Sequence, residues 1–206
     1  MSQAPAPFGV AILGAGASSR MGRPKLLLPW NTTTVIGHII GQWRQLGAAQ
    51  IAIVQRKDDT ALKTELDRLK LPVLDQIENP HPEGEMFSSV VCAAHWNGWR
   101  ADLKSVAIAL GDQPQLRRET LQGLMQCRHE RPDAVCQPAF EGRARHPVLL
   151  PWAVFHDLRS ASAKTLKDFL KQIRCPRVQY AVNDWTLSLD LDTPEDYIRA
   201  TTYYTS

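Results

Sequence analysis

One stretch, an apolar run that passes directly into a loop of small residues, most constrains how this chain can fold. Residues 10–13 form an apolar run of strand length, and over residues 14–22 the composition becomes small and polar. Gly14 and Gly16 carry no Cβ and positive φ would cost them little, so we expect them to let backbone N–H groups approach an anion closely. The stretch therefore predicts a strand that ends in a phosphate-binding loop.

Two basic side chains, Arg20 and Lys25, belong to the same stretch. Arg20 offers a planar donor fork for phosphate oxygens, whereas Lys25 is a compact charge that can follow negative charge as it develops. The spacing matches neither a Walker A loop, which needs Gly-Lys-Ser/Thr, nor a dinucleotide fingerprint, which needs three glycines that open a helix. Both of these motifs are excluded. The alternative, a glycine-rich turn with two solvated basic side chains, stays open on these residues alone.

Strand-like and helix-like segments alternate along the chain. We expect strands over residues 10–13, 51–54, 72–74, 105–110, 134–136, 147–150 and 178–181, and helices over residues 35–46, 58–70, 87–99, 116–130 and around 166–173. Helices between strands imply parallel βαβ units with right-handed crossovers. A chain of 206 residues is short for two domains. We therefore expect one α/β domain over residues 1–206, Rossmann-like, with three layers and a mostly parallel sheet.

Composition excludes several classes of protein. The chain is 44% hydrophobic and 22% charged, and it has no apolar run near the ~18 residues that a membrane span needs. Residues 1–8 lack the basic start and apolar region of a signal peptide, so we expect a cytoplasmic protein. The net charge of +3 (24 basic minus 21 acidic residues) is too small to indicate nucleic-acid binding. Neither nucleic acid nor membrane is an expected partner.

The four cysteines contain no Cys-x-x-Cys pair, which argues against a zinc or redox motif. We expect Cys92, Cys127, Cys136 and Cys175 to be reduced thiols that serve as small buried apolar residues.

Carboxylates that follow strands are candidates for chemistry, because ligands of open α/β sheets bind at the carboxyl ends of the strands. Asp112 directly follows the most apolar run, residues 105–110, in the sequence Gly-Asp-Gln-Pro. A carboxylate there could hold Mg²⁺, which takes one or two carboxylates and completes its shell with phosphate oxygens and water. The alternative is an Asp that begins a turn before Pro114.

A second acidic segment lies near the end of the chain. The alternation of leucine with polar residues over 187–192 predicts a strand with Asp190 and Asp192 on one face. Thr193 is an expected N-cap of a following helix, with Asp196 as its partner in a capping box. Asp192 is therefore either a metal ligand or a residue that only stabilises the N-terminus of that helix.

These motifs resemble those of the MobA-like nucleotidyltransferases, and within that family the molybdenum cofactor cytidylyltransferases. The family pattern reads Leu-Ala-Ala-Gly, Arg-Met-Gly, x-Pro-Lys and x-Leu-Leu; this chain has Leu13-Gly-Ala-Gly16, Arg20-Met-Gly22, Pro24-Lys25 and Leu27-Leu28. Gly-Asp-x-Pro at 111–114 resembles the metal motif of the family, and Asp-Leu-Asp-Thr-Pro-Glu-Asp at 190–196 resembles its end motif. The resemblance implies a fold of the nucleotide-diphospho-sugar transferase type.

The resemblance also implies roles for particular residues. Arg20, Lys25 and Asp112 would be catalytic, and Asp112 and Asp192 would hold Mg²⁺. The nucleotide would be bound by Leu13, Gly14, Ala15, Gly16, Arg20, Lys25, Asn79, Ser88 and Ser89. Ser88 and Ser89 have an alternative role as helix-capping residues. Ala15 stands where guanylyl-transferring relatives carry Gly, which points to a cytidylyl donor.

The acceptor region departs from the family pattern. Residues 142–147, Gly-Arg-Ala-Arg-His-Pro, resemble the Gly-x-x-Gly-His-Pro segment near the acceptor, but Arg145 stands where Gly is expected. Arg145 would either clamp an acceptor phosphate or close the site, and His146 is either an acceptor contact or structural. The downstream Gly-Asp-x-Gly segment of the family is absent, and residues 160–164 replace it.

The expected function is Mg²⁺-dependent transfer of CMP from CTP to a molybdopterin-type phosphate, with release of pyrophosphate. The implied partners are CTP or another NTP, a molybdopterin-type acceptor and a molybdoenzyme of the xanthine dehydrogenase type. One alternative is the same chemistry on a sugar or alcohol phosphate. Another is a nucleotide-binding accessory protein for molybdoenzyme maturation that does not turn over. The presence of both Lys25 and Asp112 argues against the accessory role, because simple binding does not need both.

Overall fold

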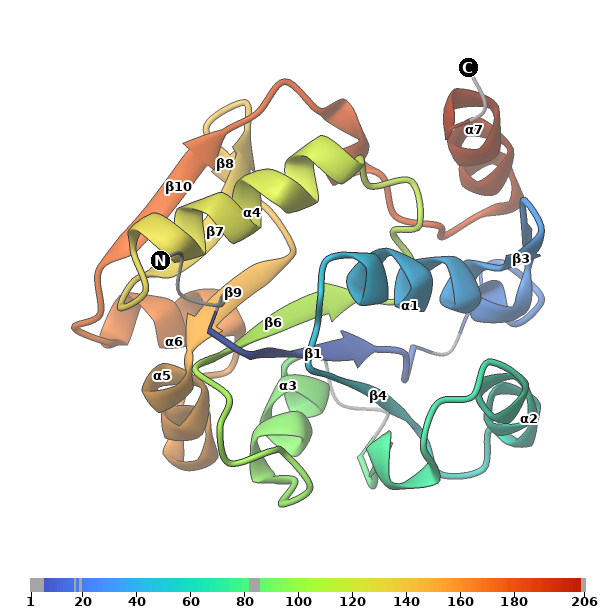
Figure 1. The fold of residues 1–206 in the computed structure, drawn as a ribbon. Helices are drawn as coiled ribbons and strands as arrows, with labels where there is room; N and C mark the ends of the chain where they lie inside the picture. Colours follow the sequence, from blue (N-terminus) through green and yellow to red (C-terminus); the bar gives the residue numbers. More distant parts are fainter. Residues whose placement is uncertain (1–5, 17, 19, 82–85, 205–206) are drawn as a thin grey trace.

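One sheet of eight strands forms the centre of the molecule in a computed structural model that describes residues 6–16, 18, 20–81 and 86–204 (Figure 1). The strand order is β10-β7-β9-β6-β1-β4-β5, and β8 pairs with β7 off this path. The strands are β1 (Phe8–Leu13), β4 (Gln50–Arg56), β5 (Gln76–Asn79), β6 (Ser105–Leu110), β7 (Val135–Phe140), β8 (Arg143–Ala144), β9 (Val148–Pro151) and β10 (Arg177–Ala181). A separate small hairpin pairs β2 (Pro29–Trp30) with β3 (Thr33–Thr34).

The centre of the sheet is parallel. β1 pairs in parallel with β4 on one side and with β6 on the other, and β4 pairs in parallel with β5. β9 runs antiparallel to both β6 and β7, so the sheet is mixed but mostly parallel. Every residue of β1 is buried, as expected for a strand with helices on both faces.

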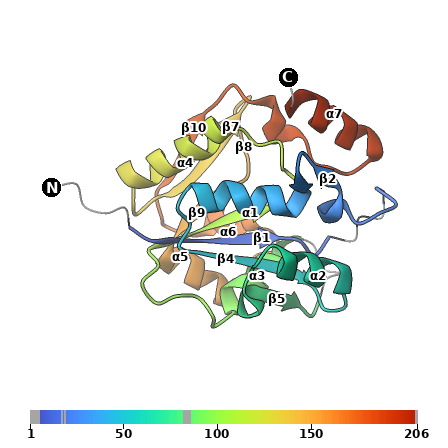
Figure 2. The same cartoon turned by 45° about the vertical axis from the view of Figure 1, so that its right-hand side comes forward.

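Helices cover both faces of the sheet (Figures 1 and 2). One layer contains α1 (Val35–Gln45), α2 (Thr60–Arg68), α4 (Arg118–Glu130) and α7 (Pro194–Tyr204), and the other contains α3 (Met86–His95), α5 (Trp152–Asp157) and α6 (Leu166–Gln172). Alternate residues of β1 divide between the two cores, because successive side chains of a strand point to opposite faces. Val10 and Ile12 pack with α1, and Ala11 and Leu13 pack with α3. The predicted three-layer α/β class is confirmed.

Capping residues mark the starts of α1 and α7. The Thr34 hydroxyl accepts a hydrogen bond from the N–H of Gly37 (3.1 Å) at the start of α1, and Gly47 follows the helix with φ of 80°. At the start of α7 the Thr193 hydroxyl accepts from the N–H of Asp196 (3.2 Å), and the Thr193 N–H donates to the Asp196 carboxylate (2.9 Å). The predicted capping box is confirmed.

The strand predicted at residues 72–74 is wrong. Val73–Asp75 is a short 3-10 helix, and Val73 and Leu74 are 72% and 84% exposed. The neighbouring strand is β5, at the edge of the sheet. Its sequence, Gln-Ile-Glu-Asn, has one apolar residue, and one of its two buried residues is the polar Asn79, so the apolar pattern pointed to the wrong segment.

The strand predicted at residues 134–136 extends further than expected. β7 continues to Phe140 and turns back into β8 through Glu141 and Gly142, which have φ of 50° and 71°. Two central residues with positive φ are typical of a tight hairpin turn. The prediction for the cysteines holds for Cys127 and Cys136, which are buried; Cys92 and Cys175 are half-buried.

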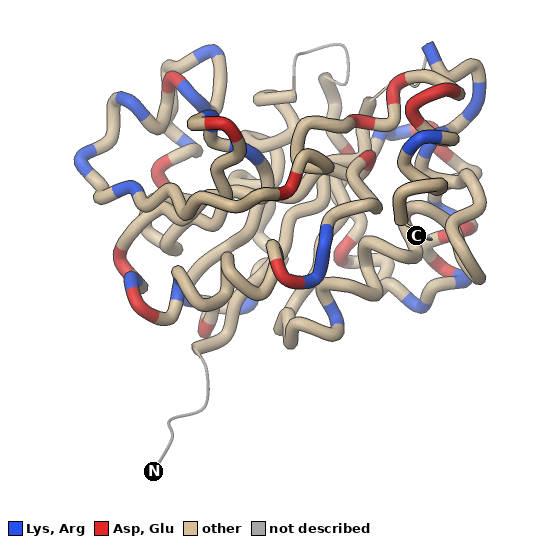
Figure 3. Tube along the Cα trace, turned by 90° about the horizontal axis from the view of Figure 1, so that it is seen from above, with Lys and Arg blue, Asp and Glu red and all other residues tan. Residues whose placement is uncertain are grey.

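Charges are spread over the molecule. Basic and acidic residues are interspersed along the trace (Figure 3). In the part of the chain that the structure describes, no helix combines the length and the apolar character that a membrane span requires.

Candidate functional site

An open pocket of about 260 Å³ lies at the carboxyl ends of β1 and β6. Three segments far apart in the sequence meet there, namely the glycine-rich loop after β1, the loop after β6 and the segment before α7. The pocket is lined by Leu13, Gly14, Ala15, Gly16, Lys25, Leu26, Met86, Ser89, Leu110, Asp112 and Asp190. The structure thus brings together the two loops that the sequence singled out.

The backbone of the first loop is tied to its neighbours. The N–H of Gly14 donates to the carbonyl of Val54 (2.7 Å), and the N–H of Gly111 donates to the carbonyl of Leu13 (2.9 Å). The Gly14 N–H is therefore engaged within the sheet. Neither Gly14 nor Gly16 uses the freedom of glycine to adopt positive φ, which in this loop occurs at Ser18 and Gly22 (50° and 69°). Gly16 does leave open space, since apart from its chain neighbours no atom of the described residues would lie within 4 Å of an added Cβ.

Gly111→Ala is expected to destabilise the protein by about 1–3 kcal/mol, because an added Cβ would lie 2.7 Å from the carbonyl oxygen of Leu13. That oxygen belongs to the backbone of β1 and cannot yield without distorting the sheet. Gly41→Ala is the matched control: it adds a methyl group to α1 with no atom within 4 Å and should stabilise by about 0.5–1 kcal/mol. Urea unfolding of both variants measures the difference. Equal stability of Gly111→Ala and wild type would contradict the close approach.

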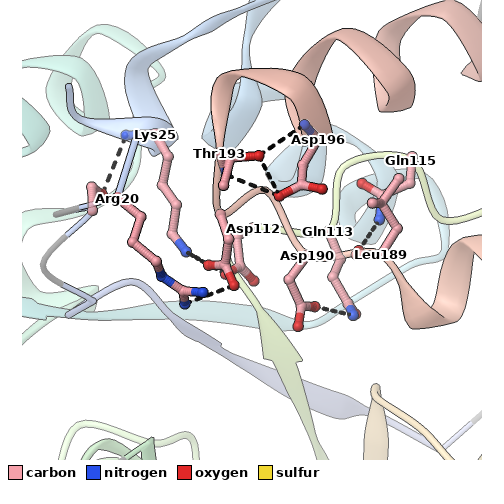
Figure 4. Close-up of polar contacts among 11 residues, drawn as sticks. Arg20, Lys25, Asp112, Gln113, Gln115, Leu189, Asp190, Thr193 and Asp196 are labelled. Atoms are coloured by element: carbon pink, nitrogen blue, oxygen red, sulfur yellow. Dashed lines mark hydrogen bonds and ion pairs between the residues drawn. The ribbon is translucent and has the colours of Figure 1, made fainter. Parts of the chain in front are cut away.

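Lys25 is the central charge of the site (Figure 4). Its ammonium Nζ lies 2.5 Å from Oδ2 of Asp112 and 3.4 Å from Oδ1 of Asp192, and its side chain is only 13% exposed. Burial lowers the pKa of Lys25, but the charges and hydrogen bonds of Asp112 and then of Asp192 outweigh burial and raise the pKa above its ordinary value. Lys25 therefore stays cationic in the neutral range.

Arg20 lies on the open side of the same cluster. Its Nη2 donates to Oδ2 of Asp192 at 2.8 Å, and its side chain is 70% exposed. The guanidinium is held by one carboxylate on the surface, where it can rearrange toward an incoming anion at little cost. Arg20 does not line the pocket itself.

The strand predicted at residues 187–192 is wrong. A 3-10 helix occupies Trp185–Ser188, and the next residues turn so that the N–H of Leu191 donates to the carbonyl of Asp112 (3.1 Å). The leucines of this segment are buried as the alternation indicated, but Asp190 and Asp192 meet different partners. Asp192 contacts the two basic side chains, whereas Asp190 lines the pocket.

Two glutamines that the sequence analysis missed hold this C-terminal segment against the loop after β6 (Figure 4). Gln113 is 4% exposed, and its Nε2 donates to Oδ1 of Asp190 at 2.8 Å. Gln115 is 1% exposed, and its Nε2 donates to the carbonyl of Leu189 at 2.5 Å. In the sequence these two residues appear as one amide residue on each side of Pro114. Partial desolvation and then the charge of Asp112 raise the pKa of Asp190, and the hydrogen bond from Gln113 opposes this rise.

Asn79, Ser88 and Ser89 form one hydrogen-bonded group beside the pocket. Asn79 is 2% exposed, and its Nδ2 donates to the hydroxyls of Ser88 (3.1 Å) and Ser89 (3.0 Å). Its Oδ1 accepts from the N–H of His81 (2.9 Å). Ser89 lines the pocket, whereas Asn79 and Ser88 lie behind it and fix the start of α3. Residues 82–85, the expected loop before this helix, lie outside the described residues.

Arg145 and His146 lie outside the pocket but near its edge. The ring of His146 contacts the carbonyl of Ile108 on β6 (Nδ1 to O, 3.4 Å). Burial lowers the pKa of His146, and the neighbouring charge of Asp112 opposes this shift. The backbone N–H of Arg145 donates to the carbonyl of Pro138 (2.8 Å), and its Nε is buried without a partner among the described residues.

Two curated proteins are similar to this chain along most of its length. A molybdenum cofactor cytidylyltransferase of Escherichia coli K12 is 23% identical over 195 residues, which cover 94% of this chain and 95% of that protein. A molybdenum cofactor guanylyltransferase of Xanthomonas euvesicatoria is 24% identical over 204 residues, which cover 94% of each.

Solved structures are similar in fold. A nucleotidyl transferase from Methanothermobacter thermautotrophicus superposes with a TM-score of 0.76 at 16% identity, over 97% of this chain and 98% of that one. Rv0371c of Mycobacterium tuberculosis in complex with manganese gives a TM-score of 0.68 at 23% identity, over 95% and 98%. The fold is therefore that of the nucleotide-diphospho-sugar transferases, as predicted.

The family model of the MobA-like NTP transferase domain matches residues 10–178, which include most of β1, the glycine-rich loop and Asp112. The chain therefore belongs to the MobA-like nucleotidyltransferase family.

Proposed function

We propose that this protein transfers CMP from CTP to a phosphate of a molybdopterin-type cofactor and releases pyrophosphate. The observation that carries the proposal is the contact of one ammonium group, Nζ of Lys25, with the carboxylates of Asp112 and Asp192. Lys25 and Asp112 line the pocket together with residues 13–16. The names of the two curated relatives support the choice of acceptor. That of the Escherichia coli protein supports the choice of CTP.

In the proposed reaction an oxygen of the acceptor phosphate attacks the α-phosphorus of CTP. A new P–O bond forms, the bond between the α-phosphorus and the bridging oxygen breaks, and pyrophosphate leaves with the electron pair. Negative charge grows on the transferred group and on the leaving group, so catalysis depends on positioning and on fixed positive charge. Lys25 supplies that charge inside the pocket, and Arg20 supplies it at the entrance.

The carboxylates of the site fit a divalent cation. The ammonium of Lys25 already shows that Asp112 and Asp192 converge on one cationic position, and Asp112 and Asp190 line the same pocket. Asp112 and Asp192 would hold Mg²⁺, which needs only one or two carboxylates; among the described residues no group of three His, Cys, Asp or Glu side chains is placed to hold a metal ion. When bound, the ion would neutralise phosphate charge. The manganese complex of the structurally similar Rv0371c supports a divalent metal here.

Ala15→Gly tests the choice of base. Ala15 is 6% exposed and lines the pocket, so its methyl group occupies space that a larger purine would need. Removing the methyl should relax the preference toward GTP, by up to about tenfold in the CTP/GTP ratio of kcat/KM, the worth of one methyl-sized contact. Steady-state kinetics with both nucleotides measures the ratio. An unchanged ratio would place base selection elsewhere in the pocket.

The function itself is tested by pyrophosphate release with each of the four NTPs, in the presence of molybdopterin or of sugar phosphates. Release that requires CTP and molybdopterin is the expected result. Release with a sugar or alcohol phosphate instead would keep the reaction and replace the acceptor. Nucleotide binding without release under any of these conditions would favour an accessory role in molybdoenzyme maturation.

A further inference from the structure

A second pocket, of about 300 Å³, opens at the opposite end of the sheet from the glycine-rich loop. Its walls are the start of β1, the residues that lead into β6 and the last turn of α4, which lie together in Figure 1. Nothing in the proposed nucleotidyl transfer uses this end of the molecule.

Arg128, in the last turn of α4, carries a buried charge that has no acidic partner. The residue is 9% exposed; its Nε donates to the hydroxyl of Ser105 (2.8 Å), and its Nη2 donates to the carbonyl of Ala6. Its guanidinium carbon lies 5.1 Å from the ring centre of Phe8. No carboxylate among the described residues forms an ion pair with Arg128.

An unpaired buried charge is unusual, because the cost of desolvation is normally offset by a counter-ion. Lys25, the buried cation of the first pocket, contacts two carboxylates. The C-terminus of α4 offsets only part of the cost for Arg128, since a helix end carries about half an elementary charge. Residues 1–5, which precede Ala6 in the sequence, contain no acidic residue. None of the described residues therefore supplies a full counter-charge to Arg128.

The rest of the pocket also carries positive charge. The exposed side chains of Lys104 and His129 line it with Arg128, and none of its described lining residues is acidic. The pocket volume exceeds what a lone carboxylate fills and suits a phosphate with a small organic group. Arginine presents a donor fork that matches phosphate oxygens, and a phosphate monoester carries close to two negative charges at neutral pH.

We propose that this pocket binds a small phosphate-bearing anion, with Arg128 as its buried anchor and Lys104 and His129 as the contacts at its mouth. The site is separate from the first pocket, so a ligand here would bind together with the nucleotide. The competing view is that Arg128 only ties the chain before β1 to α4, and it predicts no ligand.

The test follows amide signals of ¹⁵N-labelled protein during titration with inorganic phosphate and with glycerol 3-phosphate at constant ionic strength. Gly47, Ser105 and His129 report on the second pocket, and Gly14 and Gly16 report on the first. Saturable shifts of Gly47, Ser105 and His129 are expected below about 20 mM ligand. These shifts should survive in Lys25→Ala, which removes the cation of the first pocket.

Matched variants connect the shifts to the proposed contacts. The Lys104→Ala, His129→Ala double variant removes two exposed cations and should weaken Kd by about tenfold or more, the worth of one charge-assisted contact. Lys164→Ala, an exposed lysine outside the pocket, should leave Kd unchanged. The proposal would be overturned if no saturable shifts appeared or if the double variant had the Kd of wild type. It would also be overturned if citrate, titrated as a phosphate-free anion, caused the shifts and the two phosphates did not. Arg128→Lys should bind more weakly than wild type, and a melting temperature near that of wild type verifies its fold.

Discussion

Lys25→Ala is expected to lower kcat by about 10²–10³-fold, the loss seen when one preorganised electrostatic stabiliser is removed. The side chain is 13% exposed, and its raised pKa keeps it cationic across the neutral range. In the proposed reaction its ammonium leaves Asp112 and Asp192 to meet charge on the transferred group. Among the described lining residues of the pocket Lys25 is the one cation, and Arg20, the nearest other cation of the cluster, pairs with Asp192 outside the pocket.

Lys63→Ala is the control for Lys25→Ala. The Nζ of Lys63 also pairs with a carboxylate, Oε1 of Glu78 at 2.7 Å. This pair lies on the surface, and neither residue lines the pocket. A surface ion pair contributes little to stability, so this variant should melt near wild type and keep its kcat. Single-turnover kinetics separates the chemical step from product release. Wild-type turnover in Lys25→Ala would remove Lys25 from the catalytic role.

The layers of the fold were predictable because their signals are local and strong. The apolar run of β1, the caps of α1 and α7 and the helix-stopping Gly47 each follow from a few neighbouring residues. The antiparallel direction of β9 was not predictable, because pairing partners far apart in the sequence decide it. The alternation of leucine with polar residues over 187–192 predicted the burial of the leucines correctly. It did not predict the backbone conformation, because the segment bonds to a loop carbonyl and a glutamine amide and does not pair with a neighbouring strand.

The sequence predicted which loops form the candidate site, but it predicted few of the side-chain contacts between them. Lys25 and Asp112 were identified from motifs, and the structure joins them directly. Gln113 and Gln115 were missed, because a buried amide that positions a backbone segment looks in sequence like any polar loop residue. The hydrogen bond from the Gly14 N–H to the carbonyl of Val54 was not predictable either, because the two residues are far apart in the sequence.

The second large effect is expected from the carboxylates. Asp112→Asn and Asp192→Asn should each lower kcat on the order of 10²-fold or more, because each removes charge from the position where the cation is proposed to bind. The double variant should be little worse than the worse single variant, since residues that act as one unit are not additive. Turnover against Mg²⁺ concentration, together with Mn²⁺ binding followed by electron paramagnetic resonance, measures both effects.

Asp190→Asn completes the series and separates the two C-terminal carboxylates. Asp190 lines the pocket and is held by Gln113, whereas Asp192 shares the ammonium of Lys25 with Asp112. If Asp192 is the second ligand, Mn²⁺ binding should weaken more in Asp192→Asn than in Asp190→Asn. If Asp192 only stabilises α7, its variant should lose about 0.3–1 kcal/mol of stability and keep the Mg²⁺ response of wild type. A normal Mg²⁺ response in Asp112→Asn would refute the shared metal site, because that carboxylate belongs to both possible pairs.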